Sequence, residues 1–561
     1  MDLFGRILKS RGLSPEDSED FLLPKYESRH DPFLLPDMTE AVERLVEARQ
    51  KQEKITIYGD YDIDGLTATT LLLDAFDSFG FADVEAFIPN RFTEGYGLTV
   101  DAVERIAATG AKLIVTVDCG SLSHKEIARA NELGVDVIVT DHHNVAPEQP
   151  PAVAVINPKR LLHDHPGEYD KFVLKKDSKL RGELYPFLDL PGVGVAFKLV
   201  QALQTRLDGL GEGQEKWLLD LVALGTVCDV VTLVDENRTH VYWGLKVMSK
   251  TRRPGLKALL AVSGVEPHKI NARSLGFGLG PRMNAAGRLE TAQYALDMLM
   301  SSDGETALSY AKKLDDMNKT RRHDQDIIFE EALSQAEKYI DDPVLVVSSE
   351  GWNHGIVGIV AAKLLERYKK PTYVLSIDGD EAKGSARSYG DFSAADAIRA
   401  TDDIITKGGG HKLAAGVTLP ASNVDDFRRQ VNDFYRQQKL QDQARLLLPV
   451  ADTDAFLQEV DLEFVNLVSQ LEPFGNGNPQ PVLRSESLIV REARRMGSDG
   501  QHLKLSLLDT EGVGMQFLSF NAPESFFVDI NQRITVWYTP EINEWQGRRT
   551  VEARLLHLEV I

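Results

Sequence analysis

The sequence predicts an α/β protein of several domains with a small β-barrel at its C-terminal end. Between residues 54 and 158, short apolar segments alternate with helical stretches. A second, shorter series of the same kind occupies residues 343–377. From about residue 447 the pattern changes to short β segments alone. The length of 561 residues also exceeds what one hydrophobic core usually serves, so more than one domain is expected.

The first series predicts a parallel sheet with helices on both faces. Apolar strands are expected at 54–59, 111–120, 134–143 and 152–158, and each ends in a polar or glycine-containing turn. Residues 66–80 predict the helix that follows the first strand. Strands that alternate with helices favour parallel pairing. In such sheets, ligands bind beyond the carboxyl ends of the strands.

Three stretches between the two series do not follow the alternation of strands and helices. Residues 159–184 are charged and without a clear period, which indicates a surface insertion, and residues 215–231 predict a mostly apolar helix. A polar helix at about 303–340 is either a connector between domains or an ordinary amphipathic surface helix. The second series then predicts a strand, a helix and a strand at 343–349, 355–368 and 371–377.

The composition is ordinary for a globular protein, with 43% hydrophobic and 26% charged residues. No apolar run approaches the roughly 18 residues that a membrane span needs, and the first residues lack the apolar core of a secretory signal. Two cysteines cannot form a disulfide framework, so we expect a cytoplasmic protein with no membrane partner. The net charge of −22 argues against non-specific duplex binding, but bound metal ions and a few arginines can still concentrate positive charge locally.

Three aspartates at alternate positions, Asp60, Asp62 and Asp64, follow the first predicted strand. Carboxylates so close together repel one another unless a cation lies among them. The segment is therefore either a solvated acidic turn or a metal site. Asp118 and Asp141 end two other predicted strands. Because the carboxyl ends of parallel strands lie at one edge of a sheet, we expect all these carboxylates to lie close together.

Two histidines and one further aspartate extend this acidic group. His142 and His143 follow Asp141, and Asp229 lies near the end of the helix at 215–231. Mg²⁺ and Mn²⁺ favour carboxylate ligands, and Mn²⁺ also accepts imidazole. A two-metal hydrolase needs carboxylates on each ion and one that bridges them, with the ions roughly 3.5–4 Å apart. Each residue alone has an ordinary structural explanation, but their joint occurrence favours a metal site.

Four motifs in this order resemble those of the DHH phosphoesterase superfamily: GDYDIDG, VDCG, TDHH and GTVCDVV. Downstream, GWNHGIVGIVAAKL, KGSARS and GGGHKLAAG resemble its DHH-associated C-terminal domain. Within the superfamily, the sequence is most similar to the RecJ family of single-strand-specific exonucleases, through PNRFTEGYGL, PGVGVAFKL, GPRMNAAGRL and PFGNGNPQPVL. The resemblance covers about residues 54–520.

The resemblance implies a site for two ions, either Mn²⁺ or Mg²⁺. The implied ligands are Asp62 for the first ion, Asp64, His142 and Asp229 for the second, and Asp118 as the bridge, with Asp60 as a further candidate.

Other motif positions imply roles beside the ions. Asp141 would orient His142, as metal-bound imidazoles usually require, and His143 would lie beside the scissile phosphate as an electrophile or proton donor. One position departs from the pattern, since Tyr58 stands where smaller pyrophosphatase relatives have a histidine. Either the first ion is then held more loosely, or Asp60 contributes to it.

The resemblance also implies contacts to the substrate. Ser385 and Arg387 lie two residues apart in GSARS and would form a pocket for the 5′-terminal phosphate together with Arg91. Arginine suits this role because it binds phosphate with two parallel hydrogen bonds. Arg282 would hold the scissile phosphate or its neighbour, and Tyr96 would stack on a terminal base.

A glycine-rich segment adds further candidates for phosphate binding. Gly409 and Gly410 can bring backbone N–H groups against phosphate oxygens. His411 either contacts phosphate or satisfies hydrogen bonds within its loop. No segment matches the GxxxxGK[ST] loop of nucleotide triphosphatases, so ATP hydrolysis is not expected.

The resemblance implies four parts. These are a parallel-sheet DHH catalytic domain with an N-terminal extension (1–300), a helical connector (301–341), a smaller α/β DHH-associated domain that binds substrate phosphate (342–446) and an OB-type β-barrel that binds single strands (447–561).

The implied function is a 5′→3′ exonuclease that hydrolyses single-stranded DNA to 5′-mononucleotides by two-metal catalysis, in DNA repair and recombination. The expected partners are single-stranded DNA with a 5′ end, a single-strand-binding protein and a helicase, and the expected state is a monomer. Two alternatives are a DHH phosphodiesterase of short oligoribonucleotides or cyclic dinucleotides, and a non-catalytic replication scaffold. Residues 447–561 argue against the first alternative, whose members are generally shorter and lack an OB domain, and the presence of all the implied ligands argues against the second.

Overall fold

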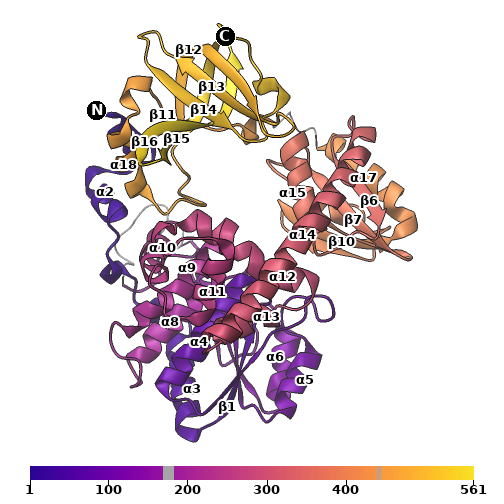
Figure 1. The fold of residues 1–561 in the computed structure, drawn as a ribbon. Helices are drawn as coiled ribbons and strands as arrows, with labels where there is room; N and C mark the ends of the chain where they lie inside the picture. Colours follow the sequence, from indigo (N-terminus) through magenta and orange to yellow (C-terminus); the bar gives the residue numbers. More distant parts are fainter. Residues whose placement is uncertain (168–181, 439, 441–443) are drawn as a thin grey trace. The chain divides into compact units, whose positions relative to one another are not determined.

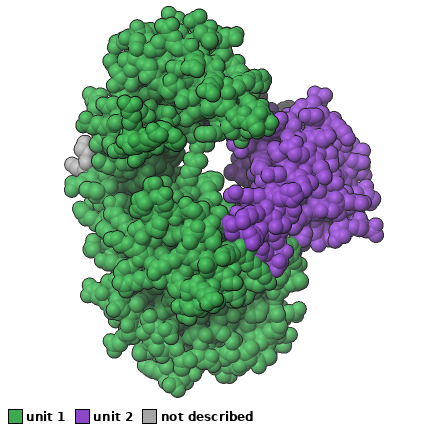
Figure 2. All heavy atoms as spheres, viewed as in Figure 1, with its two compact units in different colours: residues 1–287, 291–314, 449–561 green, residues 288–290, 315–448 purple. Residues whose placement is uncertain are grey.

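The computed structural model describes residues 1–167, 182–438, 440 and 444–561, so most of the expected insertion at 159–184 lies outside the described residues. The chain forms two compact units (Figure 2). Unit 1 comprises Met1–Gly287, Thr291–Leu314 and Pro449–Ile561, and unit 2 comprises Arg288–Glu290 and Asp315–Leu448.

The helix α14 (Gly304–Lys338) begins in unit 1 and ends in unit 2. Its 35 residues confirm the long helix expected at 303–340. It carries many charged side chains along its length. Within the described part of the chain, no helix is both long enough and apolar enough to cross a lipid bilayer.

The first sheet of unit 1 is parallel throughout and has the strand order β2-β1-β3-β4-β5. Its strands are β1 (Lys54–Gly59), β2 (Asp83–Phe87), β3 (Leu113–Val117), β4 (Asp136–Thr140) and β5 (Ala154–Ile156). The four expected strands are confirmed, whereas β2 was not predicted, because it lies at the sheet edge and its residues are only partly buried. The strand β1 has β2 on one side and β3 on the other, so the strand order reverses here, and ligands of parallel sheets bind beyond the carboxyl ends of the strands at such a point.

Helices cover both faces of this sheet, as predicted (Figure 1). On one face, Ile106 of α5 (Val100–Ala108) and Ile127 of α6 (His124–Glu132) join Ile114 and Val137 of the sheet in an apolar cluster. The helices on the other face are α3 (Met38–Lys51), α4 (Ile63–Phe79) and α8 (Gly192–Gln204).

Behind this second face lies a layer of further helices. The expected helix at 215–231 is α9 (Leu219–Cys228), which packs on α4 and α8 and is buried along almost its whole length. It is followed by α10 (Asp235–Met248), α11 (Pro254–Ser263), α12 (Gly280–Leu289) and α13 (Gln293–Met300).

A buried ion pair ties α8 to α10. Lys198 donates a hydrogen bond to Glu236 over 2.8 Å, and both side chains are almost fully enclosed. Glu236 also accepts hydrogen bonds from the Tyr185 hydroxyl and the His30 backbone N–H. Removing one partner would leave a buried charge without compensation, so this contact fixes the relative position of the two helices.

The C-terminal part of unit 1 is a closed barrel. Its strands are β12 (Leu483–Met496), β13 (His502–Leu508), β14 (Gly514–Ser519), β16 (Arg548–Val560) and β15 (Arg533–Trp545), in that spatial order. The ring closes because β12 also pairs with β15, and β14 and β16 are parallel neighbours. This confirms the predicted OB-type barrel.

The barrel core includes residues from the start of the chain. Leu3 and Ile7 of α1 (Leu3–Ser10) pack in the same apolar cluster as Phe464 of α18 (Leu462–Val468) and the inner residues of the barrel. Ion pairs from α1 and its end, Arg6 to Glu459 and Arg11 to Asp452, add to this contact. The α2 helix (Pro15–Leu22) then leads toward the parallel sheet.

Unit 2 contains a mixed sheet with the order β6-β7-β8-β10-β9, in which only β6 and β7 are parallel. Its strands are β6 (Leu345–Glu350), β7 (Thr372–Asp378), β8 (Glu381–Arg387), β9 (Lys407–Gly410) and β10 (Ala414–Pro420). The C-terminal half of α14 and α15 (Val357–Tyr368) pack on one face, and α16 (Ala394–Arg399) and α17 (Val424–Gln437) on the other. The strand, helix and strand expected at 343–377 are confirmed as β6, α15 and β7.

We predict that His240 makes unit 1 less stable at acid pH. His240 lies in α10, is fully buried, and neither ring nitrogen has a hydrogen-bond partner among the described residues. Burial lowers the pKa of His240 to about 4 from its usual 6.5. The unfolded chain therefore binds a proton below pH 6.5 that the folded chain binds only near pH 4. As the pH decreases from 6.5 to 4, the free energy of unfolding decreases by up to about 1.4 kcal/mol per pH unit.

The measurement is the thermal midpoint at pH 7.5 and pH 5.5. We expect His240→Leu to lose less stability than wild type between these two values, since leucine does not titrate. An equal loss in both proteins would contradict the prediction.

Candidate metal centre

The turn between β1 and α4 carries the three alternate aspartates. Asp62 caps α4, because its carboxylate accepts hydrogen bonds from the backbone N–H groups of Asp64, over 2.9 Å, and Gly65, over 3.2 Å. A Cβ atom on Gly65 would lie only 2.5 Å from the backbone of Asp60, so glycine is required for this tight turn. The turn therefore presents the three carboxylates at the carboxyl end of β1, as the sequence predicted.

Asp64 is held by the first turn of α8. Its two carboxylate oxygens accept hydrogen bonds from the backbone N–H groups of Gly192, over 2.6 Å, and Val193, over 2.8 Å. A helix N-terminus carries partial positive charge, so it stabilises this buried carboxylate. Gly192 and Val193 were missed as site residues, although they lie in the PGVGVAFKL segment that was already noted for its resemblance.

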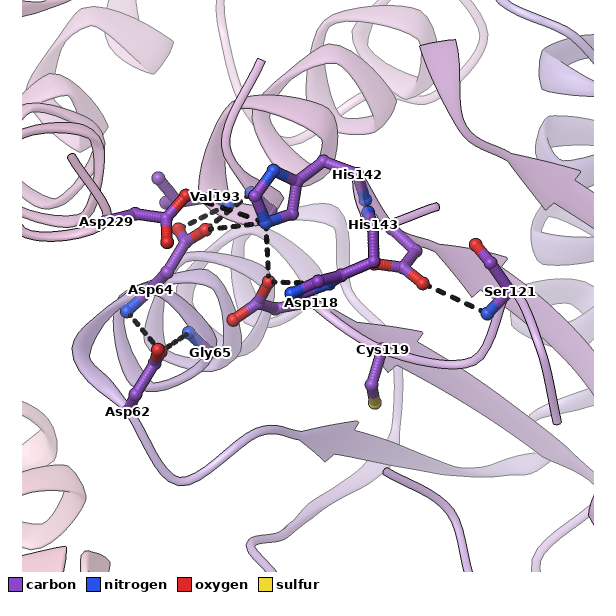
Figure 3. A network of polar contacts seen from close by, with 12 residues as sticks. Asp62, Asp64, Gly65, Asp118, Cys119, Ser121, His142, His143, Val193 and Asp229 are labelled. Carbon is purple, nitrogen blue, oxygen red and sulfur yellow. Dashed lines mark hydrogen bonds and ion pairs between the residues drawn. The ribbon is translucent and has the colours of Figure 1, made fainter. Parts of the chain in front are cut away.

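Asp118, His142 and Asp229 converge on the same point (Figure 3). The Nε2 atom of His142 lies 3.1 Å from Asp118 Oδ1, 3.5 Å from Asp229 Oδ2 and 3.8 Å from Asp64 Oδ2. Asp118 follows β3 with a φ of 61°, a conformation that aspartate tolerates better than most residues. Asp229 follows the last residue of α9 and is its C-terminal cap.

Asp141 contacts a different histidine from the one predicted. Its carboxylate lies 2.9 Å from Nδ1 of His143 and accepts hydrogen bonds from the backbone N–H groups of Ser121 and His142. The expectation that Asp141 orients the His142 ring is therefore wrong, because β4 ends at Thr140 and the chain turns the ring of His143 back over Asp141. Burial lowers the pKa of His143, but the hydrogen bond and the negative charge of Asp141 raise it, and the net shift is upward.

Tyr96 lies beside His143. Its hydroxyl is 3.0 Å from His143 Nδ1 and donates a hydrogen bond to the backbone carbonyl of Asp118 over 3.3 Å, while about half of the side chain remains exposed. Tyr58 is fully buried, stacks on Phe87 and donates a hydrogen bond to the carbonyl of Gly97. Tyr58 thus supports the loop that carries Tyr96.

Four atoms of this centre are buried and have no hydrogen-bond partner in the described part of the chain. They are Asp60 Oδ1, Asp118 Oδ1, Asp229 Oδ2 and His142 Nε2. Burial and the charges of neighbouring carboxylates raise the pKa values of Asp60, Asp64, Asp118 and Asp229, and burial lowers the pKa of His142 to about 3. Buried polar atoms without partners require an explanation, and divalent cations supply one, since carboxylates with a neutral imidazole match the preference of Mn²⁺.

The predicted metal ligands fall into overlapping groups that could each hold an ion. Within a group, one ligand atom per residue lies within 4.8 Å of the others. The groups are Asp60 with Asp62 and Asp118, Asp64 with His142 and Asp229, and Asp118 with His142 and His143. The structure thus brings together every predicted ligand, with Asp118 shared between two of the groups.

Two predicted substrate contacts in unit 1 lie near this centre. The guanidinium group of Arg91 lies 5.3 Å from the ring centroid of Tyr61, which is part of the acidic turn. Arg282 lies in α12, whose Gly280 approaches Cys228 at the end of α9, and it donates a hydrogen bond to the carbonyl of Gly278 over 2.6 Å. Arg91 therefore lies beside the acidic turn, and the helix that carries Arg282 begins beside the end of α9.

The other predicted contacts lie in unit 2. Ser385 and Arg387 project from the same face of β8 toward the first turn of α15, where a Cβ atom on Gly358 would lie 3.3 Å from both side chains. Gly409 is next to Gly416 in the sheet, and Gly416 is next to Ser385. The glycine-rich strand β9, which also carries Gly410 and precedes His411, is exposed. Ser385 and Arg387 thus lie at a helix N-terminus, which is the geometry of many phosphate sites.

Comparisons with known proteins define the class of this chain. The model of the DHH family, N-terminal domain, matches residues 54–226, that of the DHHA1 domain matches 341–437, and that of the RecJ OB domain matches 451–557. The chain is 35% identical to the single-stranded-DNA-specific exonuclease RecJ of Dickeya dadantii over 94% of this chain and 91% of that protein. It is 37% identical to the protein of the same name from Bacillus subtilis over 98% of this chain, and spans 66% of that longer protein.

Solved structures agree. The crystal structure of RecJ from Thermus thermophilus in complex with Mn²⁺ superposes with a TM-score of 0.80 at 28% identity, and the match covers 99% of this chain and 75% of that one. The fold and the carboxylate–histidine cluster thus define a DHH-type phosphoesterase. More particularly, the chain belongs to the RecJ family.

We predict that the metal-free protein is destabilised by its own carboxylates. Asp118→Asn removes one buried negative charge and keeps the shape of the side chain, and asparagine also tolerates the positive φ. Without divalent ions, the variant should unfold at a higher temperature than wild type, by roughly 2–4 °C for each kcal/mol of relieved repulsion. With Mn²⁺ the order should reverse, since only wild type gains the full stabilisation by the ion.

Thermal unfolding with EDTA and with Mn²⁺ measures both effects. A variant that is less stable than wild type in EDTA would contradict the prediction.

Proposed function

We propose that this protein is a metal-dependent 5′→3′ exonuclease that degrades single-stranded DNA to 5′-mononucleotides, in DNA repair and recombination. The observation that carries the proposal is the set of buried carboxylate and imidazole atoms that converge at the carboxyl ends of β1 and β3 without hydrogen-bond partners among the described residues. The relatives named above support the substrate, because their names specify single-stranded DNA. Polarity and product follow from the family resemblance of the motifs.

The centre would hold two ions, Mn²⁺ or Mg²⁺. Asp62, with Asp60 beside it, would serve the first ion, and Asp118 would be shared. Asp64, His142 and Asp229 would serve the second. When bound, the ions supply charge neutralisation of the phosphate and activation of water. The backbone N–H groups of α8 hold Asp64 in place before any ion binds.

His143 is proposed to contact the scissile phosphate. Asp141 holds its Nδ1 atom, which leaves Nε2 as the nitrogen that faces a substrate. Asp141 raises the pKa of His143, which favours the protonated ring relative to a free imidazole, and that form would donate a hydrogen bond from Nε2 to a phosphate oxygen. The Tyr96 hydroxyl also contacts Nδ1 of His143, and the exposed part of the Tyr96 ring can stack on a base. Arg282 would hold the scissile phosphate or its neighbour.

The 5′ end is proposed to be recognised by Ser385 and Arg387. The two side chains lie at the N-terminus of α15, where a terminal phosphate would meet a guanidinium group and the positive end of a helix. Gly409, Gly410 and His411 would add contacts along the strand, and the barrel would bind single-stranded DNA further from its end.

The remaining expectations are proposed with the same function. The four parts would divide near residues 300, 341 and 446, and the protein would act as a cytoplasmic monomer with a single-strand-binding protein and a helicase. A phosphodiesterase of short oligoribonucleotides or cyclic dinucleotides remains the alternative to be tested. The match to the RecJ OB domain over residues 451–557 favours the exonuclease.

We predict that wild type with Mn²⁺ releases mononucleotides from the 5′ end of a single strand. The substrate is a 5′-phosphorylated oligonucleotide of about 40 nucleotides, labelled separately at either end, with the matching duplex as a control. Asp118→Asn should reduce the rate by several orders of magnitude, because Asp118 is shared by two ligand groups. Degradation of only di- to pentanucleotides or of a cyclic dinucleotide would favour the alternative, and binding without cleavage would favour a scaffold.

We predict that Arg387→Ala reduces the preference for a 5′-phosphate. A charge-assisted hydrogen bond contributes about 1.5–3 kcal/mol, so the ratio of kcat/KM for 5′-phosphate over 5′-hydroxyl strands should fall roughly 10- to 100-fold. Arg399→Ala is the matched control, because Arg399 is an exposed arginine of the same unit that pairs with Asp396. An unchanged ratio in Arg387→Ala would refute the proposed pocket.

A further inference from the structure

The residue after Asp229 has an unusual backbone conformation. Val230 has a φ of 61°, in the left-handed region that β-branched residues strongly avoid. Its side chain is 64% exposed, so burial of the valine does not offset the strain. Strained residues persist only where their surroundings hold them in place. The connection between α9 and α10 must therefore be held by contacts elsewhere.

Those contacts come from the loop that precedes the barrel. The Asn476 side chain donates a hydrogen bond to the carbonyl of Val230 over 2.9 Å. The carbonyl of Asn476 accepts a hydrogen bond from the backbone N–H of Leu233 over 2.7 Å. One residue of the barrel segment thus binds both ends of the four-residue stretch 230–233, although 246 positions separate Asn476 from Val230 in sequence.

The loop fits closely against this stretch. A Cβ atom on Gly475 would lie 2.7 Å from the side chain of Leu233, and one on Gly477 would lie 3.0 Å from Thr232. The glycines of the PFGNGNP segment, which the sequence singled out without a role, therefore allow the two backbones to meet.

A buried arginine fixes the loop itself. Arg238 of α10 is 2% exposed and donates hydrogen bonds to the backbone carbonyls of residues 470–473 and to the carbonyl of Phe21. The other half of the connection is held within the parallel-sheet domain, since Asp189 accepts hydrogen bonds from the backbone N–H and the hydroxyl of Thr232. The first half, next to Asp229, depends on Asn476.

We infer that Asn476 is a positioning residue for Asp229: the barrel segment 475–477 holds the strained Val230 turn and so sets where the Asp229 carboxylate lies. The inference rests on the proposed role of Asp229 as a metal ligand. Without the contact, the chain can relax Val230 to negative φ, which rotates the peptide unit that joins it to Asp229. A part of the protein assigned to strand binding then also determines how well the catalytic centre binds metal.

The test is Mn²⁺ affinity measured by isothermal titration calorimetry on the full chain, with the metal dependence of exonuclease rate as a second readout. Asn476→Ala should weaken Mn²⁺ binding by about 10-fold, as loss of supporting contacts around ligands commonly does. The rate should approach that of wild type at saturating Mn²⁺, because no ligand is lost. Asn466→Ala is the matched control, since Asn466 is an exposed asparagine of the same domain whose side chain accepts a hydrogen bond from Arg549, away from the Val230 turn.

A second substitution tests the strain directly. Glycine adopts positive φ without steric cost, so Val230→Gly should reduce the dependence on Asn476. The double variant Asn476→Ala/Val230→Gly should therefore lose less Mn²⁺-binding free energy than the sum of the losses measured in the two single variants. Strictly additive effects would overturn the inference.

Asp229→Asn distinguishes failure of the inference from failure of the proposed function. If Asp229→Asn weakens Mn²⁺ binding and Asn476→Ala leaves it unchanged, the positioning role is wrong and the metal role of Asp229 stands. If Asp229→Asn leaves Mn²⁺ binding unchanged, the proposed ligand set is wrong, and the inference falls with it. A lower thermal midpoint of Asn476→Ala with unchanged Mn²⁺ affinity would also overturn the inference, because a merely structural role predicts that result.

Discussion

The structure depends on one electrostatic constraint, which is the concentration of carboxylates at the carboxyl ends of β1 and β3. The strand order of the parallel sheet reverses between these two strands. Asp60, Asp64 and Asp118 are each at most 4% exposed, and they repel one another at this point. The protein opposes this repulsion with backbone N–H groups: Asp62 caps α4, and Asp64 accepts hydrogen bonds from the first turn of α8. Glycines at the contacts let the helices approach closely enough for this, since a Cβ atom on Gly192 would lie 2.6 Å from that of Asp118.

The helices that supply these groups are held by contacts away from the site. Lys198 and Glu236 join α8 to α10, and Glu236 also binds the segment around His30. Arg238, two residues further along α10, binds the backbone that leads into the barrel. The position of the carboxylates is thus set by a frame that includes the N-terminal segment and the barrel as well as the parallel sheet.

Much of this arrangement could be predicted from the sequence. Aspartates that end apolar parallel strands must meet at one sheet edge, so the clustering of the strand-end carboxylates could be predicted from alternation, whereas the ligand roles came from the family resemblance. The donors to Asp64 could not be predicted, because backbone N–H groups leave no signature in side-chain chemistry. Which of the two histidine rings contacts Asp141 depends on the backbone turn after β4. The sequence TDHH alone does not indicate whether this ring is that of His142 or His143. The edge strand β2 escaped prediction because half-buried residues lack a clear apolar pattern.

The packing of α1 in the barrel has a consequence for how the chain is made. Leu3 and Ile7 belong to the same core as residues of β12 to β16, and 448 positions separate Arg6 from its contact Asp454. At roughly 5–20 residues per second, a ribosome needs about 20–90 s to make that interval. During this time the apolar face of the first helix has no native surface to cover it. The nascent chain must therefore keep α1 soluble until the residues of the barrel have been synthesised.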